Sequence, residues 1–424
     1  MIMITQKING VVNAKILDPN SGSISAPSRI DFDGKRIDSI TPHSQTSPAS
    51  GLDGYYDAEG AIVMPGLVDS HVHITANTAG LSDLGHQSPS YNAATAFRAM
   101  EDSLLRGFTT LRDAGGADFG FYQAIQDDLV TAPHLYFAGK SISQTGGHAD
   151  MRGPGTHTLD EHPCCPHMGV VCDGADEVRK AAREQLRTGA HHLKIMLSGG
   201  VASPTDRIDS TQFSDAEIIA AVEEASSANR YVLGHAYTAK SINRGLRLGV
   251  RSIEHGNFLD EESVDLFLEN DAFLVPTLIT YYRLKEDGLA NGLPAGSLDK
   301  LDEVLEAGLS GLKLASDKGV NIAYGSDLLG DMRDWQNKEF EIRSRVQKPL
   351  DLIRSATVNA AKLLMAEGEI GEVVEGCYAD LLIMNGNPLD DISLLVNPST
   401  GINSVISKGS HVSRDSHAAG LCED

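Results

Sequence analysis

The middle of the chain alternates short apolar runs with amphipathic segments, which predicts parallel strands separated by helices. A run of four to eight apolar residues between turn residues is typical of a buried strand, whereas apolar residues spaced by three and four indicate a helix. Eight runs of the first kind lie between residues 61 and 327, and we expect strands at 61–68, 108–113, 134–139, 191–197, 231–235, 250–255, 272–277 and 320–327.

Helix signals lie between these runs. Ser214 and Glu217 form an S-x-x-E capping box before an apolar segment, and residues 176–190 space their apolar positions by four and end at a glycine. Eight strands alternating with helices predict an α/β fold, a (β/α)8 TIM barrel. The alternative is a doubly wound open sheet, which needs a glycine-rich phosphate turn after its first strand. The sequence has no such turn.

The two ends of the chain differ from the middle. Residues 1–60 and 376–408 consist of short alternating runs and turn residues without a helical pattern. A chain of 424 residues also exceeds what one ordinary core holds. We therefore predict a small β-sandwich domain built from both termini, 1–61 with 366–424, and a barrel domain over 62–365.

Charge and composition exclude several classes of function. The net charge of −23 repels phosphate backbones, so nucleic-acid binding is not expected. No apolar stretch reaches the ~18 residues of a membrane span, and the N-terminus lacks the pattern of a secretory signal. Five cysteines are too few for a disulfide framework. We expect a cytoplasmic protein with a small-molecule substrate.

Six potential metal ligands lie at the ends of the predicted strands. Catalytic groups of barrel enzymes lie at the C-terminal ends of the strands. A histidine there is often only hydrogen-bonded in the core, an aspartate can cap a helix, and a lysine can pair with an acid. Six such residues on one rim nevertheless favour a metal site: His71, His73, Lys194, His235, His255 and Asp327.

Three of these residues, the pair His71 and His73 and the single Lys194, have chemistry that suits a metal site. His71 and His73 flank one residue in an extended segment, so both imidazoles point the same way and can start a site for Zn²⁺ or a similar ion. Lys194 lies on the inward face of its strand, where an unpaired ammonium costs several kcal/mol and shifts toward its neutral form. A neutral amine can react with carbon dioxide, and the resulting carbamate can bridge two metal ions. A lysine paired with an inward acid remains the alternative.

The motifs in combination resemble a known family. VMPGLVDSHVH, LKIMLSGG, LGHAYT, SIEHGN, YGSD and the terminal ADLLIMNGNPLDDI are similar to segments of the amidohydrolase superfamily with a binuclear metal centre. More narrowly, the chain resembles the prolidase-like and imidazolonepropionase-like branch, which includes Xaa-Pro and Xaa-Arg dipeptidases and ochratoxin-hydrolysing amidases. The resemblance extends over nearly the whole chain.

The resemblance implies a role for each candidate ligand. His71, His73 and Asp327 would hold one divalent ion, His235 and His255 the other, and carbamylated Lys194 would bridge both. Zn²⁺ suits this ligand set, with Mn²⁺ or Co²⁺ as alternatives. A hydroxide shared by the two ions would attack the amide carbonyl, and Asp327 would carry its proton to the leaving amine.

Further positions are assigned by the same resemblance. His148 and Tyr237 correspond to a histidine and a tyrosine near the substrate, although a loop-structuring histidine and a packed tyrosine are the structural alternatives. Independently of the resemblance, Arg152 and Arg207 could donate to a substrate carboxylate from the rim, with simple exposure to solvent as the alternative. The Cys- and His-rich stretch 157–172 fits no zinc template, and we interpret it as an irregular active-site loop.

The expected reaction is hydrolysis of an amide bond to an amino acid, by a dipeptidase, a carboxypeptidase or an N-acyl-amino-acid amidase, with ochratoxin A as one substrate in range. The alternative is a cyclic-amide hydrolase, imidazolonepropionase-like, or a deaminase. Deaminases usually use one metal and need no lysine, so Lys194 disfavours them. A non-enzymatic barrel would have lost ligands, whereas all six positions are filled here. The branch also implies a homo-oligomer.

Overall fold

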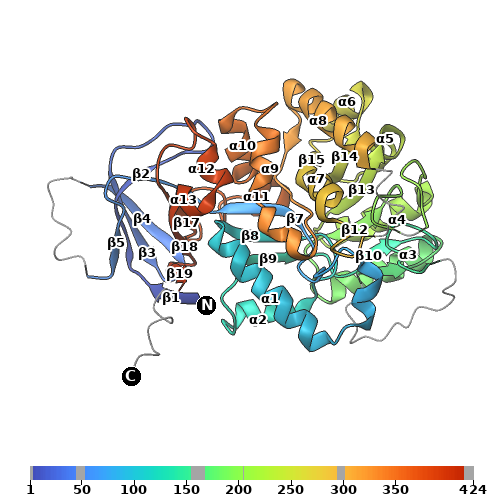
Figure 1. The fold of residues 1–424 in the computed structure, drawn as a ribbon, viewed down its shortest axis with the longest axis horizontal. Helices are drawn as coiled ribbons and strands as arrows, with labels where there is room; N and C mark the ends of the chain where they lie inside the picture. The colour runs from blue at the N-terminus through green and yellow to red at the C-terminus, as the bar shows by residue number, and fades with distance from the viewer. Residues whose placement is uncertain (1–2, 44–52, 154–167, 204, 294–300, 415–424) are drawn as a thin grey trace.

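The structure, a computed structural model, describes residues 3–43, 53–153, 168–203, 205–293 and 301–414. Strands from the two chain ends, blue and red in Figure 1, lie together at one end of the molecule. The parallel strands and most helices occupy the rest of it. This arrangement confirms the α/β class.

Strands from both ends of the chain form one mixed sheet. Its order is β1-β19-β18-β17-β6-β2-β3-β4, with β5 beside β2. The first and last strands are antiparallel neighbours, with Met3 opposite Arg414. The strands of this sheet are β1 (Met3–Lys7), β2 (Gly10–Ile16), β3 (Ser28–Asp33), β4 (Arg36–Pro42), β5 (Tyr55–Asp57), β6 (Ile62–Pro65), β17 (Leu381–Met384), β18 (Ile402–Ser407) and β19 (Ser410–Arg414).

The middle of the chain forms two parallel sheets. One has the order β7-β8-β9 and the other β11-β10-β12-β13-β14-β15-β16. Backbone hydrogen bonds connect the two sheets, from Ser70 N to Tyr324 O at 2.7 Å and from His191 N to Phe137 O at 2.9 Å. The strands are β7 (Leu67–Val72), β8 (Phe108–Asp113), β9 (His134–Phe137), β10 (Ser141–Ser143), β11 (Gly169–Val171), β12 (Leu193–Met196), β13 (Val232–Thr238), β14 (Ser252–Phe258), β15 (Phe273–Val275) and β16 (Asn321–Ile322).

The prediction of one strand over 61–68 is wrong, because the chain changes sheets at Gly66. Residues 62–65 form β6 in the mixed sheet, and β7 of the parallel sheet begins at Leu67. A Cβ at Gly66 would lie 2.1 Å from Thr109 Oγ1, so only glycine permits this passage. The strand predicted over 134–139 is also shorter than expected: β9 ends at Phe137, and the chain enters the second parallel sheet as β10 at Ser141.

Helices follow the parallel strands as the spacing predicts. The Ser214–Glu217 capping box is present and begins α4. No helix among the described residues has the length and apolar character needed to cross a membrane. The α-helices are α1 (Pro89–Leu105), α2 (Phe119–Gln126), α3 (Ala175–Arg187), α4 (Asp215–Ser227), α5 (Ala239–Arg247), α6 (Glu261–Glu269), α7 (Leu278–Asp287), α8 (Leu301–Lys318), α9 (Lys338–Arg343), α10 (Pro349–Ser355), α11 (Val358–Leu364), α12 (Ser393–Val396) and α13 (Pro398–Gly401), with 3-10 turns η1 (Leu81–His86) and η3 (Gly330–Trp335).

One apolar cluster joins the mixed sheet to the parallel strands. It contains Leu382 and Val405 of the mixed sheet together with Phe108 and Leu111 of β8. Burial of such side chains contributes roughly 1.5–3 kcal/mol each. The mixed sheet therefore supports β8, which in turn pairs with β7, the strand that carries the first candidate ligands.

Candidate metal centre

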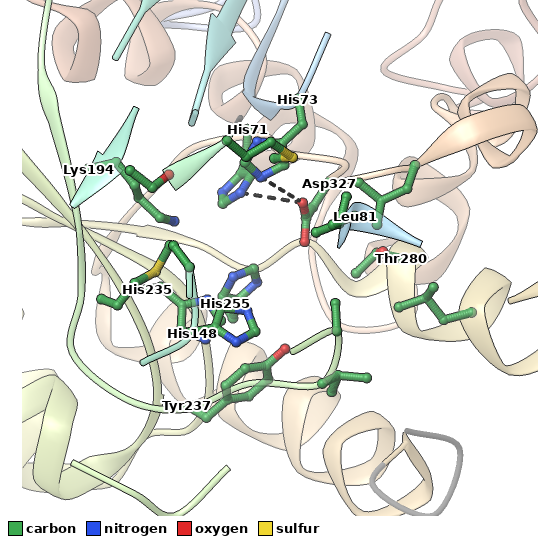
Figure 2. A pocket seen from close by; sticks show the side chains of 18 of the residues that line it. His71, His73, Leu81, His148, Lys194, His235, Tyr237, His255, Thr280 and Asp327 are labelled. Atoms are coloured by element: carbon green, nitrogen blue, oxygen red, sulfur yellow. Dashed lines mark ion pairs between the residues drawn. The ribbon is translucent and has the colours of Figure 1, made fainter. Parts of the chain in front are cut away.

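The first group of candidate ligands consists of His71, His73 and Asp327. His71 lies within β7 and His73 directly after it, and Asp327 N donates a hydrogen bond to His71 O at 2.8 Å. Asp327 Oδ1 lies 3.5 Å from His71 Nε2 and 3.4 Å from His73 Nε2 (Figure 2). These three ligand atoms all lie within 4.8 Å of one another, a spacing at which one ion could contact all three.

The second group consists of His235 and His255, on neighbouring strands. β13 and β14 are parallel, and Ala236 pairs with His255 in their register. The two imidazole centroids are 4.6 Å apart, and that of His255 is 5.2 Å from that of His71. Among the described residues, no third His, Cys, Asp or Glu completes a ligand cluster with this pair. An ion here would need a further ligand of another kind.

Lys194 lies on β12 and lines the same pocket as both groups. Figure 2 shows its amine pointing toward the space between them. The side chain is buried, and no hydrogen bond or ion pair of Lys194 is found within the described chain. Burial lowers the pKa of the amine, although the charges of Glu254 and Asp327 oppose this shift. Burial thus favours the neutral amine, the form that reacts with carbon dioxide.

Burial also keeps the four imidazoles in their neutral form. Removal from water disfavours the imidazolium, so the pKa of His71, His235 and His255 lies well below the usual value. The same effect lowers the pKa of His73 to about 3. The neutral imidazole is the form that binds a metal ion, so all four side chains are ready to act as ligands.

One ring nitrogen of each imidazole is held by an oxygen, which leaves the other nitrogen available to a metal. Such contacts fix the ring orientation and the tautomer of a ligand. Three rings are held at Nδ1 and one at Nε2: His71 by Glu254 Oε2 (2.6 Å), His73 by Gly115 O (2.7 Å), His255 by Thr277 Oγ1 (2.8 Å), and His235 at Nε2 by Gly199 O (3.2 Å).

Three residues in β14 and after β15 and β16 have a left-handed backbone. The φ angles are 74° at His255, 48° at Thr277 and 51° at Asp327. Residues 254 and 255 of a regular strand would point to opposite faces. The unusual φ at His255 allows both side chains to approach His71, Glu254 through its carboxylate and His255 through its ring. Strain of this kind persists where the surrounding structure enforces it, often at functional sites.

His148 and Tyr237 also line the pocket. The His148 ring stacks on that of His235 with centroids 4.1 Å apart, and its Nδ1 lies 2.8 Å from Ser203 Oγ. Its Nε2 is therefore the nitrogen left for a substrate. Tyr237 stacks on His255, and burial raises the pKa of its phenol, which keeps a neutral hydroxyl in the pocket.

The rest of the pocket wall is mostly apolar, and it contains no arginine among the described residues. Arg152 instead pairs with Asp150, and Arg207 pairs with Asp209 on the surface. Neither therefore supplies the carboxylate donor expected from the sequence. The apolar lining side chains include Leu81, Met151, Met168, Val201, Leu284 and Leu329.

The Cys- and His-rich stretch lies mostly outside the described residues, including His157, His162, Cys164, Cys165 and His167. Its last member, Cys172, is a buried free thiol.

Several site residues escaped the sequence analysis, namely Arg112, Glu254, Thr277 and Thr280. Arg112 and Glu254 are charged residues inside strands that were otherwise recognised as buried, which is the signal that could have revealed them. The Thr280 hydroxyl lines the pocket and, within the described chain, has no hydrogen-bond partner although it is buried. Thr280 lies in the first turn of α7, where a threonine is not unusual, so the sequence gives no signal that would have identified it.

The donor set fits divalent metal ions. Neutral imidazoles and a carboxylate are the ligands that Zn²⁺ prefers, and Mn²⁺ and Co²⁺ accept them as well. The buried, unpaired amine of Lys194 stands where the second group lacks an anionic ligand, so the residues present fit a pair of ions when that amine is carboxylated.

Comparison with known proteins agrees with this chemistry. Residues 62–412 match the model of the amidohydrolase family. An ochratoxinase of Aspergillus niger is 32% identical over 355 residues, 80% of this chain and 73% of the relative. A prolidase crystallised with N-methylphosphonate-L-proline is 40% identical, with a TM-score of 0.91 over 96% of this chain and 99% of the other. An imidazolonepropionase of Cutibacterium acnes is 24% identical over 82% of this chain and 81% of the relative.

The lowered pKa of His73 predicts a pH-dependent stability of the metal-free protein. Below the pKa of ~6.5 of an unfolded histidine, the unfolded chain takes up a proton that the folded chain accepts only near pH 3. Stability is therefore lost as the pH falls from 7 to 4. In His73→Gln this contribution is absent, so the free energy of unfolding should decline less steeply than in the wild type.

Urea unfolding at several pH values measures this difference. His86→Gln, at an exposed position, is the control and should follow the wild-type profile. Parallel profiles for His73→Gln and the wild type would contradict the assigned effect of burial.

Proposed function

Since this chain belongs to the amidohydrolase family and is a hydrolase of carbon–nitrogen bonds, we propose that it cleaves an amide bond to an amino acid with two divalent ions. One observation carries the proposal. The His71 and His255 rings, one from each ligand group, are 5.2 Å apart, and the buried amine of Lys194 points between the groups (Figure 2). Two adjacent sites with a position for a shared anionic ligand are what a binuclear hydrolase needs.

We assign the parallel strands to one closed (β/α)8 barrel. The hydrogen bonds Ser70 N to Tyr324 O and His191 N to Phe137 O support closure, since they connect the two parallel sheets. The barrel domain would span 62–365, and 1–61 with 366–424 would form the terminal β-sandwich domain. Residues 62–65 fall on the barrel side of this division although they pair, as β6, within the mixed sheet, and the chain passes to the parallel strands at Gly66.

The ligand roles follow from the two groups. His71, His73 and Asp327 would hold one ion and His235 with His255 the other, with carboxylated Lys194 completing both. Zn²⁺ is the expected metal. When bound, the ions supply Lewis acidity that activates water and polarises the scissile carbonyl.

Asp327 is the residue we assign to proton transfer. Its Oδ1 faces His71 Nε2 and His73 Nε2, which leaves Oδ2 to accept a proton. Burial raises the pKa of this carboxyl, which brings it closer to neutral pH, where a general base works best. Asp327 would take one proton from the attacking water and deliver it to the leaving nitrogen as the C–N bond breaks. The acyl carbon keeps the remaining hydroxyl.

His148, Tyr237 and Thr280 would orient the substrate. Each presents a polar atom to the pocket: an imidazole Nε2, a neutral phenol and an unpartnered hydroxyl. The phenol and the hydroxyl can donate to a carbonyl or a carboxylate without a buried counter-charge, whereas His148, whose Nδ1 faces Ser203 and Asp206, presents its Nε2 to the substrate. The apolar wall would accept a hydrophobic side chain or an aroyl group on the other side of the bond.

The proposed substrates are dipeptides with a free carboxylate, Xaa-Pro among them, and N-acyl amino acids such as ochratoxin A. The prolidase at 40% identity, crystallised with a proline derivative, and the ochratoxinase at 32% support this class. The alternative, a cyclic-amide hydrolase, has the more distant support of the imidazolonepropionase at 24%. Deamination is disfavoured by Lys194. Association into a homo-oligomer stays a prediction.

Replacement of Lys194 should remove metal. Lys194→Ala lacks the side chain that we place between the two groups, and no other described residue takes that place, so we expect at least one ion per chain to be lost and activity to fall by about 10²-fold or more. Elemental analysis of the purified protein measures the loss. Lys408→Ala, which truncates a largely buried lysine in the turn after β18, should keep its metal. Full metal content in Lys194→Ala would refute the binuclear centre.

Asp327→Asn should depress kcat by about 10² or more, because proton transfer by a positioned side chain contributes ~10²–10⁴. Asparagine tolerates the φ of 51° at this position, so the loss of the carboxylate is tested with little added backbone strain. Melting temperature and metal content are measured alongside. A lowered melting temperature with near-normal kcat would indicate a structural role instead.

Recognition of a carboxylate is tested with one dipeptide and its C-terminal amide. Loss of a hydrogen-bonded charge costs roughly 1.5–3 kcal/mol, so kcat/KM should be about 10-fold lower or more for leucyl-prolinamide than for leucyl-proline. Metal-depleted enzyme serves as the blank. Equal kcat/KM values would remove carboxylate recognition and favour the cyclic-amide alternative.

A further inference from the structure

A fully buried ion pair, Arg112 with Glu254, lies directly behind His71. Both side chains are 0% exposed. Arg112 donates from one terminal nitrogen to both carboxylate oxygens of Glu254 at 2.8 Å. The same carboxylate lies 2.6 Å from His71 Nδ1 through Oε2. The pair comes from β8 and β14, which do not neighbour one another in the sheets.

The pair holds both the ring of His71 and the backbone next to it. Arg112 Nε donates to Ser70 O, the carbonyl that precedes His71. Ser252 Oγ donates to the second carboxylate oxygen of Glu254. Each carboxylate oxygen of Glu254 thus has two hydrogen-bond partners, and the His71 imidazole cannot rotate without breaking a buried contact.

Stability alone does not explain the pair. Removing two charges from water usually costs about as much as their attraction returns, and apolar residues of similar size are often equally stable. A buried pair that also fixes a ligand has a second use. A partner on the outer nitrogen of a ligating histidine sets its tautomer and raises its basicity.

We propose that Glu254 and Arg112 are positioning residues that fix His71 as the Nδ1–H tautomer. The carboxylate accepts the Nδ1 hydrogen, so the lone pair lies on Nε2, the nitrogen that faces Asp327 Oδ1 at 3.5 Å. Arg112 compensates the charge that Glu254 brings into the interior. This inference rests on the proposed function only in requiring that an ion binds at His71.

Within the described chain, the outer ring nitrogens of the other three candidate ligand histidines have no carboxylate partner. His73 and His255 are held by neutral oxygens, a backbone carbonyl and the Thr277 hydroxyl. A carboxylate is a stronger hydrogen-bond acceptor than a neutral oxygen. Its hydrogen bond to one ring nitrogen makes the other ring nitrogen a better electron-pair donor to a metal. His71 is therefore the strongest imidazole ligand of the site, and the ion bound by His71, His73 and Asp327 is the first to bind and the last to be removed by a chelator.

The test measures zinc affinity by competition with a chromophoric chelator, on the full chain. Glu254→Gln should weaken binding of the tighter ion by about 10–100-fold, the usual effect of losing such a partner. Asp380→Asn is the matched control, because Asp380, directly before β17, forms a buried contact at 2.9 Å with His134 of β9. That variant should lower the melting temperature and leave zinc affinity unchanged. Wild-type zinc affinity in Glu254→Gln would overturn the inference.

A measurement on the wild type covers the case in which Glu254→Gln does not fold. Nitrogen chemical shifts of the metal-free chain labelled with ¹⁵N-histidine report each tautomer, and the His71 signal is identified by its loss in His71→Asn. We expect hydrogen on Nδ1, and hydrogen on Nε2 would overturn the inference. A wild-type chain that binds no zinc would instead refute the proposed function, while the tautomer remains measurable.

Discussion

The exclusion of water from the C-terminal ends of the parallel strands determines the chemistry of this site. Three imidazoles and an amine are buried within one pocket, and His73 and Asp327 are largely shielded there, so charged forms are costly. Removal from water keeps each imidazole in the neutral form that can bind a metal and lowers the pKa of the Lys194 amine. The same low polarity requires a partner for every group that remains charged, which is why Glu254 lies against Arg112.

The backbone contributes a second constraint. His255, Thr277 and Asp327, in β14 and after β15 and β16, adopt left-handed φ angles, and each costs roughly 1–3 kcal/mol. Their contacts offset this cost: Thr277 holds His255, and Asp327 N bonds to His71 O. Because these bonds connect β7, β14 and the segments that follow β15 and β16, the geometry of the candidate ligands depends on the sheets as a whole rather than on a mobile loop.

Sequence patterns located the strand ends and hence the residues that the structure brings into one pocket. His71 and His73 could be placed because alternation along a strand is a local property. The partners of the ligands could not, since the contact of Glu254 with His71 depends on strand pairing across the fold and on an unusual φ at residue 255. The change of sheet at Gly66 was missed for the same reason: it depends on close packing against Thr109, not on apolar periodicity.

Electrostatics limits how such a pocket can recognise an anion. The chain carries a net charge of −23, which disfavours approach of a carboxylate, and no arginine lines the described pocket. Attraction would then come from the proposed metal ions, while the Tyr237 phenol and the Thr280 hydroxyl would supply direction through neutral donors. Neutral donors discriminate by geometry rather than by charge, so a carboxylate at one fixed distance from the scissile bond would be preferred over one farther away. The apolar wall imposes no comparable restriction on the acyl side, which is consistent with relatives as different as a prolidase and an ochratoxinase.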